Sequence, residues 1–338
     1  MYVIISFLAV VALIVIAYLG VAWAGLRYLF GVVIPYAAVA VFFIGLIRRV
    51  LDWASSPVPF RIPTTAGQQK SLEWIKYSKI ENPSTTWGVV MRMFFEIVTF
   101  RSLFRNMALD YREEGPTLRY SSAKWLWLFA IVFHYSFLVV LLRHLRFFTE
   151  PIPQWVKGLE ALDSFFEVGL PLLQISGVVL LGAVGLLFLR RIVIPQLRYI
   201  SLPSDYFPLF LIMGIAATGI LMRYFIRVDV VHIKELTMSL VTFHPSVPDG
   251  ISPWFFVHLL LVCVLFAYFP FSKLTHMAGV FLSPTRNLAN TNRMVRHPLP
   301  PGWKFPGKID AYKVHTYEEY EEEFREEMKE AGIPVEKE

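Results

Sequence analysis

The sequence predicts an all-α integral membrane protein with six transmembrane helices. Of its 338 residues, 56% are hydrophobic and only 17% are charged, a balance typical of membrane proteins. Six apolar stretches are also long enough to cross a hydrocarbon core of about 30 Å, which takes about 20 helical residues. The predicted spans are residues 2–22, 28–47, 125–148, 165–189, 206–226 and 254–282.

These spans divide the chain into four parts. Twelve basic residues lie between Arg48 and Lys124, both included, and basic loops stay on the cytoplasmic side. We therefore expect a multi-pass protein of the cell membrane with both termini in the cytoplasm. The parts are two N-terminal transmembrane helices (1–49), a cytoplasmic or interfacial connection (50–123), a four-helix core (124–284) and a cytoplasmic tail (285–338).

Two segments outside the spans also carry many apolar side chains. Residues 87–107 predict an interfacial helix on the inner leaflet, with docking on a partner subunit as the alternative. Residues 223–253 follow the fifth span and mix charges with apolar side chains. We expect them to form a lid across the outer mouth of the bundle. The expected apolar face of this lid consists of Val230, Val231, Ile233, Leu236 and Leu240.

Metal chemistry in this chain has to use histidine. The single cysteine, Cys263, excludes an intramolecular disulfide, a cysteine-ligated iron–sulfur cluster and a CxxCH heme attachment. The net charge of +6 follows from basic cytoplasmic loops, so it does not indicate nucleic acid.

Four histidines lie in two of the predicted spans. His134 and His144 are ten residues apart in the third span, and His258 and His276 are eighteen apart in the last. In continuous helices these separations are about 15 Å and about 27 Å, with the second pair on one helix face. Bending at Pro270, helix tilt or inclined cofactors would have to absorb the difference.

Because the two spans run in opposite directions, His134 should face His276 near the inner surface. His144 should likewise face His258 near the outer surface. Histidines inside membranes are costly and turn inward to a partner or cofactor. Two facing pairs predict a diheme helix bundle that binds two heme b, and simple hydrogen bonding between helices is the alternative.

Three runs then become recognisable: LVTFHP (240–245), VHLLLV (257–262) and FPFSKLTH (269–276). They resemble the cytochrome b (gamma) subunit of respiratory nitrate reductases, and the resemblance covers residues 125–284. It implies that the heme ligands are His134, His144, His258 and His276. The extra N-terminal helix, the long connection and the acidic tail are similar to the membrane cytochrome b of the dissimilatory sulfite-reduction-associated redox complex.

The resemblance implies an electron-transfer subunit of a membrane oxidoreductase in anaerobic sulfite or sulfate respiration. It would exchange electrons between menaquinone or menaquinol and a cytoplasmic iron–sulfur subunit resembling heterodisulfide reductase. Other implied partners are a second quinone-interacting membrane subunit, a periplasmic iron–sulfur subunit and a multiheme cytochrome c. One alternative is a gamma-type subunit of a nitrate or heterodisulfide reductase. Another is a heme-free transporter or scaffold, although no internal repeat is evident.

Charged residues near the span ends are candidates for two further roles. Arg190, Arg191 and Lys273 are expected to hold the propionates of the inner heme, and Arg143 those of the outer heme. Arg143 stands where the nitrate reductase family has glycine, and that family's quinol-binding lysine falls near Phe165, so its quinone site does not transfer. The quinone-site candidates are Asp163, Glu167, His232, Lys234, Glu235 and His244.

Overall fold

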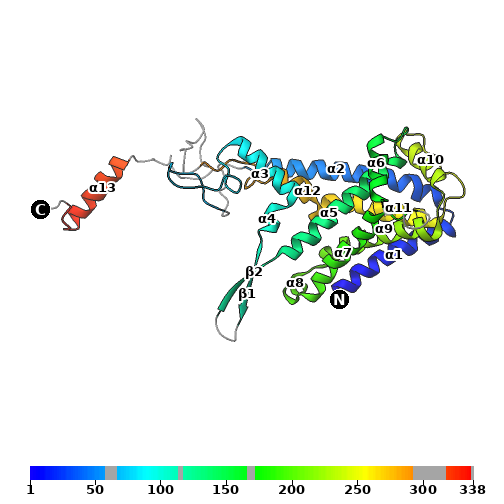
Figure 1. Cartoon of the computed structure of the whole chain (residues 1–338), viewed down its shortest axis with the longest axis horizontal. Coiled ribbons are helices and arrows are strands. Elements are labelled where there is room, and N and C mark those ends of the chain that lie inside the picture. Colours follow the sequence, from blue (N-terminus) through cyan, green and yellow to red (C-terminus); the bar gives the residue numbers. More distant parts are fainter. Residues whose placement is uncertain (58–66, 113–116, 166–171, 292–316, 336–338) are drawn as a thin grey trace. The chain divides into compact units, whose positions relative to one another are not determined.

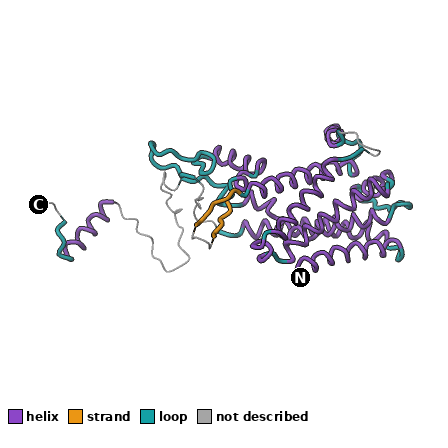
Figure 2. The backbone as a smooth tube through the Cα atoms, turned by 60° about the horizontal axis from the view of Figure 1, so that its bottom comes forward, coloured by secondary structure: helices purple, strands orange, loops and turns teal. Residues whose placement is uncertain are grey.

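The computed structural model describes the chain except residues 58–66, 113–116, 166–171, 292–316 and 336–338. It divides into two units, Met1–Thr291 and Asn292–Glu338. In the first unit the long helices run side by side in one bundle (Figures 1 and 2). The second unit contains the helix α13 (Tyr317–Glu330).

Six helical segments of the described chain are long and apolar enough to cross a membrane. They are Tyr2–Ala22, Leu29–Ala54, Lys124–Phe147, Ile175–Val193, Pro203–Ile226 and Pro253–Phe271. Helices suit a hydrocarbon environment because every backbone N–H and C=O can be hydrogen-bonded within the segment. The predicted fold class, a helical membrane protein with six spans, is confirmed.

The spans are built from the helices α1 (Tyr2–Ala22), α2 (Ile34–Ala54), α5 (Lys124–His144), α7 (Ile175–Val193), α9 (Pro203–Ile220) and α11 (Pro253–Tyr268). Shorter helices are α3 (Thr86–Thr99), α4 (Arg101–Phe104), α6 (Gln154–Asp163), α8 (Pro195–Ile200), α10 (Val230–Val241) and α12 (His276–Leu282). One antiparallel hairpin, absent from the sequence prediction, joins β1 (Met107–Arg112) to β2 (Thr117–Ser122). Its strands lead from α4 to α5 (Figure 1).

Helix α11 lies at the centre of the bundle. It packs against α1, α2 and α9, while α7 packs against both α5 and α9. Phe256, Val257 and Leu261 of α11 are fully buried, and so is Leu211 of α9. Since lipid tails are as apolar as these side chains, close van der Waals packing holds the helices together.

The last predicted span is shorter than expected. Helix α11 ends at Tyr268, and two 3₁₀ turns, Phe269–Phe271 and Lys273–Thr275, precede α12. Pro270 lies in the first turn, and proline has no N–H to continue a helix. His276 therefore begins a separate helix, and the prediction that it shares one continuous helix with His258 is wrong.

Other features also differ from the sequence prediction. The helix of the fourth span begins at Ile175 rather than residue 165, and α6 is a separate helix that ends at Asp163. The segment 87–107 forms α3 and α4, which are separated at Phe100 by a left-handed backbone with φ of 50°. Helix α10 lies in the segment expected to form the lid. Only part of the expected apolar face is buried, because Ile233 and Leu236 are buried while Val230 and Val231 are exposed.

Candidate heme-binding sites

The four histidines of the spans meet in the two pairs that the sequence predicted. His144 of α5 and His258 of α11 have ring centroids 6.4 Å apart and planes inclined by 14°. His134 of α5 and His276 of α12 have centroids 5.9 Å apart and planes inclined by 81°. We name them the outer pair (His144 and His258) and the inner pair (His134 and His276), after the predicted sides of the membrane.

Both separations fit two imidazoles on opposite sides of one metal ion. A metal–imidazole nitrogen bond is about 2 Å long, and the ring centroid lies about 1 Å farther out, so two such rings have centroids about 6 Å apart. Within the described parts of the chain, no three or more His, Cys, Asp or Glu residues form a metal-binding group. Pairs without a third ligand suit the two axial positions of heme iron, whose other ligands come from the macrocycle.

Hydrogen bonds at Nδ1 fix which nitrogen of each ring is free. The Nδ1 atoms of His134, His144 and His276 lie 2.7, 2.6 and 2.8 Å from the carbonyl oxygens of Ala130, Val140 and Lys273, respectively. A carbonyl oxygen only accepts, so these Nδ1 atoms donate and Nε2 keeps its lone pair. Metal-ligating histidines are held in the same way.

His258 makes a different bond. Its Nδ1 lies 2.9 Å from Oγ1 of Thr218 on α9, and this oxygen lies 2.7 Å from the carbonyl oxygen of Gly214. The sequence interpretation missed Thr218. The only available signal was that it is the single threonine of the fifth predicted span.

Aromatic rings surround both pairs. The rings of Phe100 and Phe133 lie nearly perpendicular to that of His134, with centroids 4.9 and 5.0 Å away, and the ring centroid of Phe147 lies 5.9 Å from that of His144. Phe100 occupies the break between α3 and α4. The connection between the second and third spans therefore contacts the inner pair directly.

At the outer pair, Arg143, which was expected to hold the heme propionates, already has a carboxylate partner. Its Nε lies 2.9 Å from Oδ2 of Asp163, and both side chains are buried, at 7% and 6% exposure. Asp163 also accepts hydrogen bonds from the backbone N–H and the hydroxyl of Ser176, both at 2.7 Å. The carboxylate thus joins α5, α6 and the start of α7, next to His144.

At the inner pair, two of the predicted cations converge on Asp205. Lys273 Nζ lies 2.5 Å from Oδ1 of Asp205, and Arg191 Nη1 lies 3.8 Å from Oδ2. Arg191 also donates to the hydroxyl of Ser201 at 2.9 Å. Arg190 is partly buried at the end of α7.

A hollow lies beside His276, and Glu96 and Arg286 also line it. Arg92 lies one turn before Glu96 on α3. It is buried, and among the described residues its Nη1 has no hydrogen-bond partner. Burial lowers the pKa of this guanidinium, and the nearby Arg286 lowers it further. The sequence interpretation missed Arg92 because it looked like an ordinary charge on an interfacial helix.

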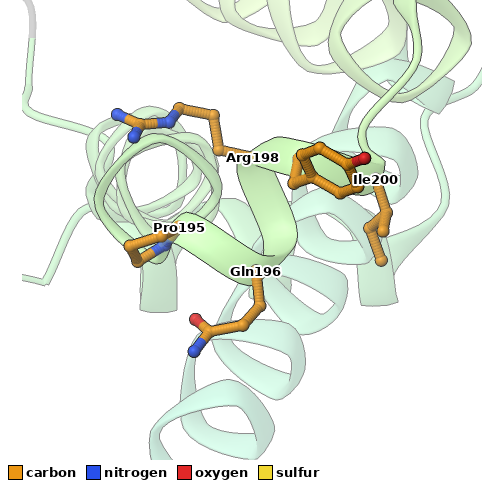
Figure 3. A pocket seen from close by; sticks show the side chains of 5 residues that line it. Pro195, Gln196, Arg198 and Ile200 are labelled. Atoms are coloured by element: carbon orange, nitrogen blue, oxygen red, sulfur yellow. The ribbon is translucent and has the colours of Figure 1, made fainter.

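A second hollow lies on α8 and is lined by Pro195, Gln196, Arg198, Tyr199 and Ile200 (Figure 3). None of the four histidines lines it, and its lining comes from a single short helix. We therefore do not assign it a cofactor.

The quinone-site candidates are found in two places. Asp163 is buried next to Arg143, whereas the others that the structure describes lie on or after α10. His232 Nδ1 is 2.7 Å from Oδ2 of Asp229, and Lys234 forms an ion pair with Glu150. Glu235 and His244 are exposed, and Glu167 lies outside the described residues.

Helix α10 is anchored next to the outer pair. Its Thr237 hydroxyl donates to the carbonyl of Phe147 at 2.6 Å, three residues after His144. At its start, Asp229 accepts a hydrogen bond from the N–H of Val231 at 2.8 Å. The pKa of Asp229 is held below its usual range, first by this hydrogen bond and second by the neighbouring His232.

Comparisons with known proteins place this arrangement in a family. Residues 84–297 match the nitrate reductase gamma subunit family, and this range contains both histidine pairs. The chain belongs to the nitrate reductase gamma subunit family. It is accordingly a multi-pass membrane protein of the cytochrome b type, and this type of protein carries heme b.

Individual relatives agree with this assignment. The chain is 48% identical over 279 residues to the Hdr-like menaquinol oxidoreductase cytochrome b-like subunit of Archaeoglobus fulgidus, covering 80% of this chain and 83% of the relative. The protein of the same description from Archaeoglobus profundus is 45% identical, covering 79% and 81%. The respiratory nitrate reductase 1 gamma chain of Escherichia coli is 27% identical, covering 54% and 89%.

Proposed function

We propose that this chain is a diheme cytochrome b subunit that exchanges electrons between menaquinol or menaquinone and a cytoplasmic iron–sulfur partner. The observation that carries the proposal is the presence of two histidine pairs with ring centroids 6.4 and 5.9 Å apart. The relatives that are 48% and 45% identical are described as subunits of a menaquinol oxidoreductase, which supports the quinone as electron donor or acceptor.

In this proposal His144 and His258 ligate the outer heme b, and His134 and His276 the inner one. Each histidine would use Nε2, because its Nδ1 is already hydrogen-bonded. When bound, heme iron accepts and releases one electron at a time, at a potential set by its ligands and surroundings. The protein supplies ligation, burial and hydrogen bonds, and makes or breaks no substrate bond beyond the quinone couple.

The heme propionates are anions and need charge-assisted donors. Arg143 is our candidate at the outer heme, since one carboxylate at Nε leaves its two Nη groups to donate to another anion. At the inner heme we propose Arg190, Arg191 and Lys273. We add Arg92, whose buried Nη1 has no partner among the described residues.

For the quinone we propose a site between the outer pair and α10. Quinol oxidation releases protons, so the site needs groups that accept hydrogen bonds and a path to water. The candidates remain Asp163, Glu167, His232, Lys234, Glu235 and His244. The link from Thr237 to Phe147 supports this site because it holds α10 over the end of α5 that carries His144.

On the cytoplasmic side, we propose that the iron–sulfur partner binds among three segments: the connection 50–123, residues 190–204 and the tail. The tail helix α13 carries eight glutamates and leaves Tyr320 and Phe324 exposed one turn apart. A partner with a basic surface and an apolar groove would fit both features.

We propose that the whole assembly is the sulfite-reduction-associated redox complex of anaerobic sulfite or sulfate respiration. The partner would then be a heterodisulfide-reductase-like subunit. A second quinone-interacting membrane subunit, a periplasmic iron–sulfur subunit and a multiheme cytochrome c would complete the complex. The description of the relatives as Hdr-like supports this choice over a nitrate reductase.

Substitution of one ligand tests the heme assignment. His258→Ala should remove the outer heme and leave the inner one, so the purified variant should contain about half the heme of the wild type. His244→Ala is the control, because this exposed histidine lies after α10. Full heme content in His258→Ala, with both spectral components present, would contradict the assignment.

A further inference from the structure

We propose that Thr218 is a positioning residue for the outer heme: its hydroxyl accepts the Nδ1 proton of His258, which fixes the ring and strengthens electron donation from Nε2. The inference rests on the proposed ligation of heme by His144 and His258. It concerns what distinguishes the outer site from the inner one.

The direction of the hydrogen bond follows from the contacts of Thr218. Its Oγ1 lies 2.7 Å from the carbonyl oxygen of Gly214 and 3.0 Å from that of Ile215, and both of these oxygens can only accept. A hydroxyl has one proton, and here it goes to a carbonyl of its own helix. The oxygen is then the acceptor for the Nδ1–H of His258, at 2.9 Å.

This arrangement is buried, with Thr218 at 5% exposure. Hydrogen bonds in a chain polarise one another in a medium of low dielectric. The chain from His258 through Thr218 to a backbone carbonyl therefore draws the Nδ1 proton away from the ring. A ligand histidine with such a partner is more basic at its other nitrogen, which favours ferric over ferrous iron.

The other three histidines bond to carbonyls three or four residues earlier in the chain, so their rings are held locally. His258 instead bonds from α11 to α9. Its orientation, nearly parallel to His144 at 14°, therefore depends on a neighbouring helix. Loss of the hydroxyl should release this ring alone.

The ring orientation has a spectroscopic consequence. In low-spin ferric heme, the angle between two axial imidazoles controls the splitting of the iron d orbitals that overlap with their π systems. Nearly parallel rings at the outer pair and nearly perpendicular rings at the inner pair, at 81°, predict two distinct electron paramagnetic resonance (EPR) signals. If each pair binds a heme, the more anisotropic signal would come from the inner one.

The test compares Thr218→Val, which removes the hydroxyl, with Thr218→Ser, which keeps it. Ser136→Ala is the matched control, because among the described residues this buried hydroxyl of α5 bonds only to the carbonyl of Phe133, at 3.0 Å. Heme content, EPR spectra and redox titrations are measured on the purified proteins. The signal that disappears in His258→Ala identifies the outer heme.

We expect Thr218→Val to keep both hemes and to make the outer one easier to reduce. The expected change is up to about tenfold in the ratio of reduced to oxidised heme, or about 59 mV for one electron. Only the outer EPR signal should change, and Thr218→Ser and Ser136→Ala should resemble the wild type. Loss of the outer heme alone in Thr218→Val, with rescue by serine, would also support the inference.

An unchanged outer potential and EPR signal in Thr218→Val would overturn it, because the hydroxyl would then not be needed to hold the His258 ring. Equal changes at both hemes, or the same changes in Ser136→Ala, would also overturn it by indicating a general packing effect. A wild-type protein without heme would instead refute the proposed function, so the two failures can be told apart.

Discussion

The buried ion pair between Arg143 and Asp163 offers a quantitative test of the outer site. Asp163→Asn keeps the shape of the side chain but removes the charge that faces Arg143 at 2.9 Å. Since both groups are at most 7% exposed, little water can replace the lost carboxylate. Breaking a buried pair in this way typically costs about 3–5 kcal/mol.

Helix α6 provides its own control. Glu160 forms an ion pair with Arg146 in which both side chains are partly exposed, at 26% and 31%. Glu160→Gln should cost only about 0.2–1 kcal/mol, as exposed pairs do. Thermal unfolding of the detergent-solubilised protein, followed together with heme content, measures both variants.

We expect Asp163→Asn to lower the melting temperature by roughly 10 °C and Glu160→Gln by a few degrees at most, taking about 2–4 °C per kcal/mol. The outer heme should be lost first on heating, because Arg143 precedes its ligand His144. Equal, small shifts for the two variants would refute the reasoning. They would mean that Asp163 is not the main charge compensating Arg143.

Two further predictions concern the quinone and the partner. Lys234→Gln should slow reduction of the outer heme by a menaquinol analogue without changing heme content. The control Val231→Ala, at an exposed position of the same helix, should leave the reduction rate unchanged. Equal rates for the two variants would place the quinone elsewhere. Replacing both Tyr320 and Phe324 with alanine should reduce co-purification of the cytoplasmic iron–sulfur subunit, while Glu323→Gln should reduce it less. Undiminished association of the double variant would move the contact to residues 50–123 or 190–204.

Much of the architecture could be predicted from the sequence because hydrophobic length is a strong signal. A run of about 20 apolar residues has few alternatives to a membrane helix, and all six spans were found. The pairing of the histidines could also be predicted from the sequence, since helix direction and depth in the membrane determine which rings can meet. The roles of these histidines as heme ligands stay predictions.

The path of the chain between His258 and His276 could not be derived from spacing alone. The mismatch between ten and eighteen residues was visible, and so was Pro270. Periodicity does not indicate that two 3₁₀ turns replace the helix there. Because the helix is broken, the distance that a continuous helix would set between His258 and His276 does not apply. Both histidine pairs form although the helix is not continuous.

Contacts between helices were the least predictable part. Two contacts illustrate this: Asp163 with Arg143 and Ser176, and Thr218 with His258. Both depend on how each helix is rotated about its own axis in the bundle. Such rotations are set by side-chain packing and leave little trace in one sequence. The hairpin β1–β2 was missed because its strands are short and contain charged residues, Asp110, Arg112 and Arg119.

The central claim, two hemes each held by two histidines, is tested most directly by heme quantification and EPR spectroscopy of the purified wild-type protein. The account predicts two heme b per chain, both low-spin, with two different ferric signals. A protein that binds no heme, binds only one per chain, or shows a high-spin heme with a single histidine ligand would contradict it.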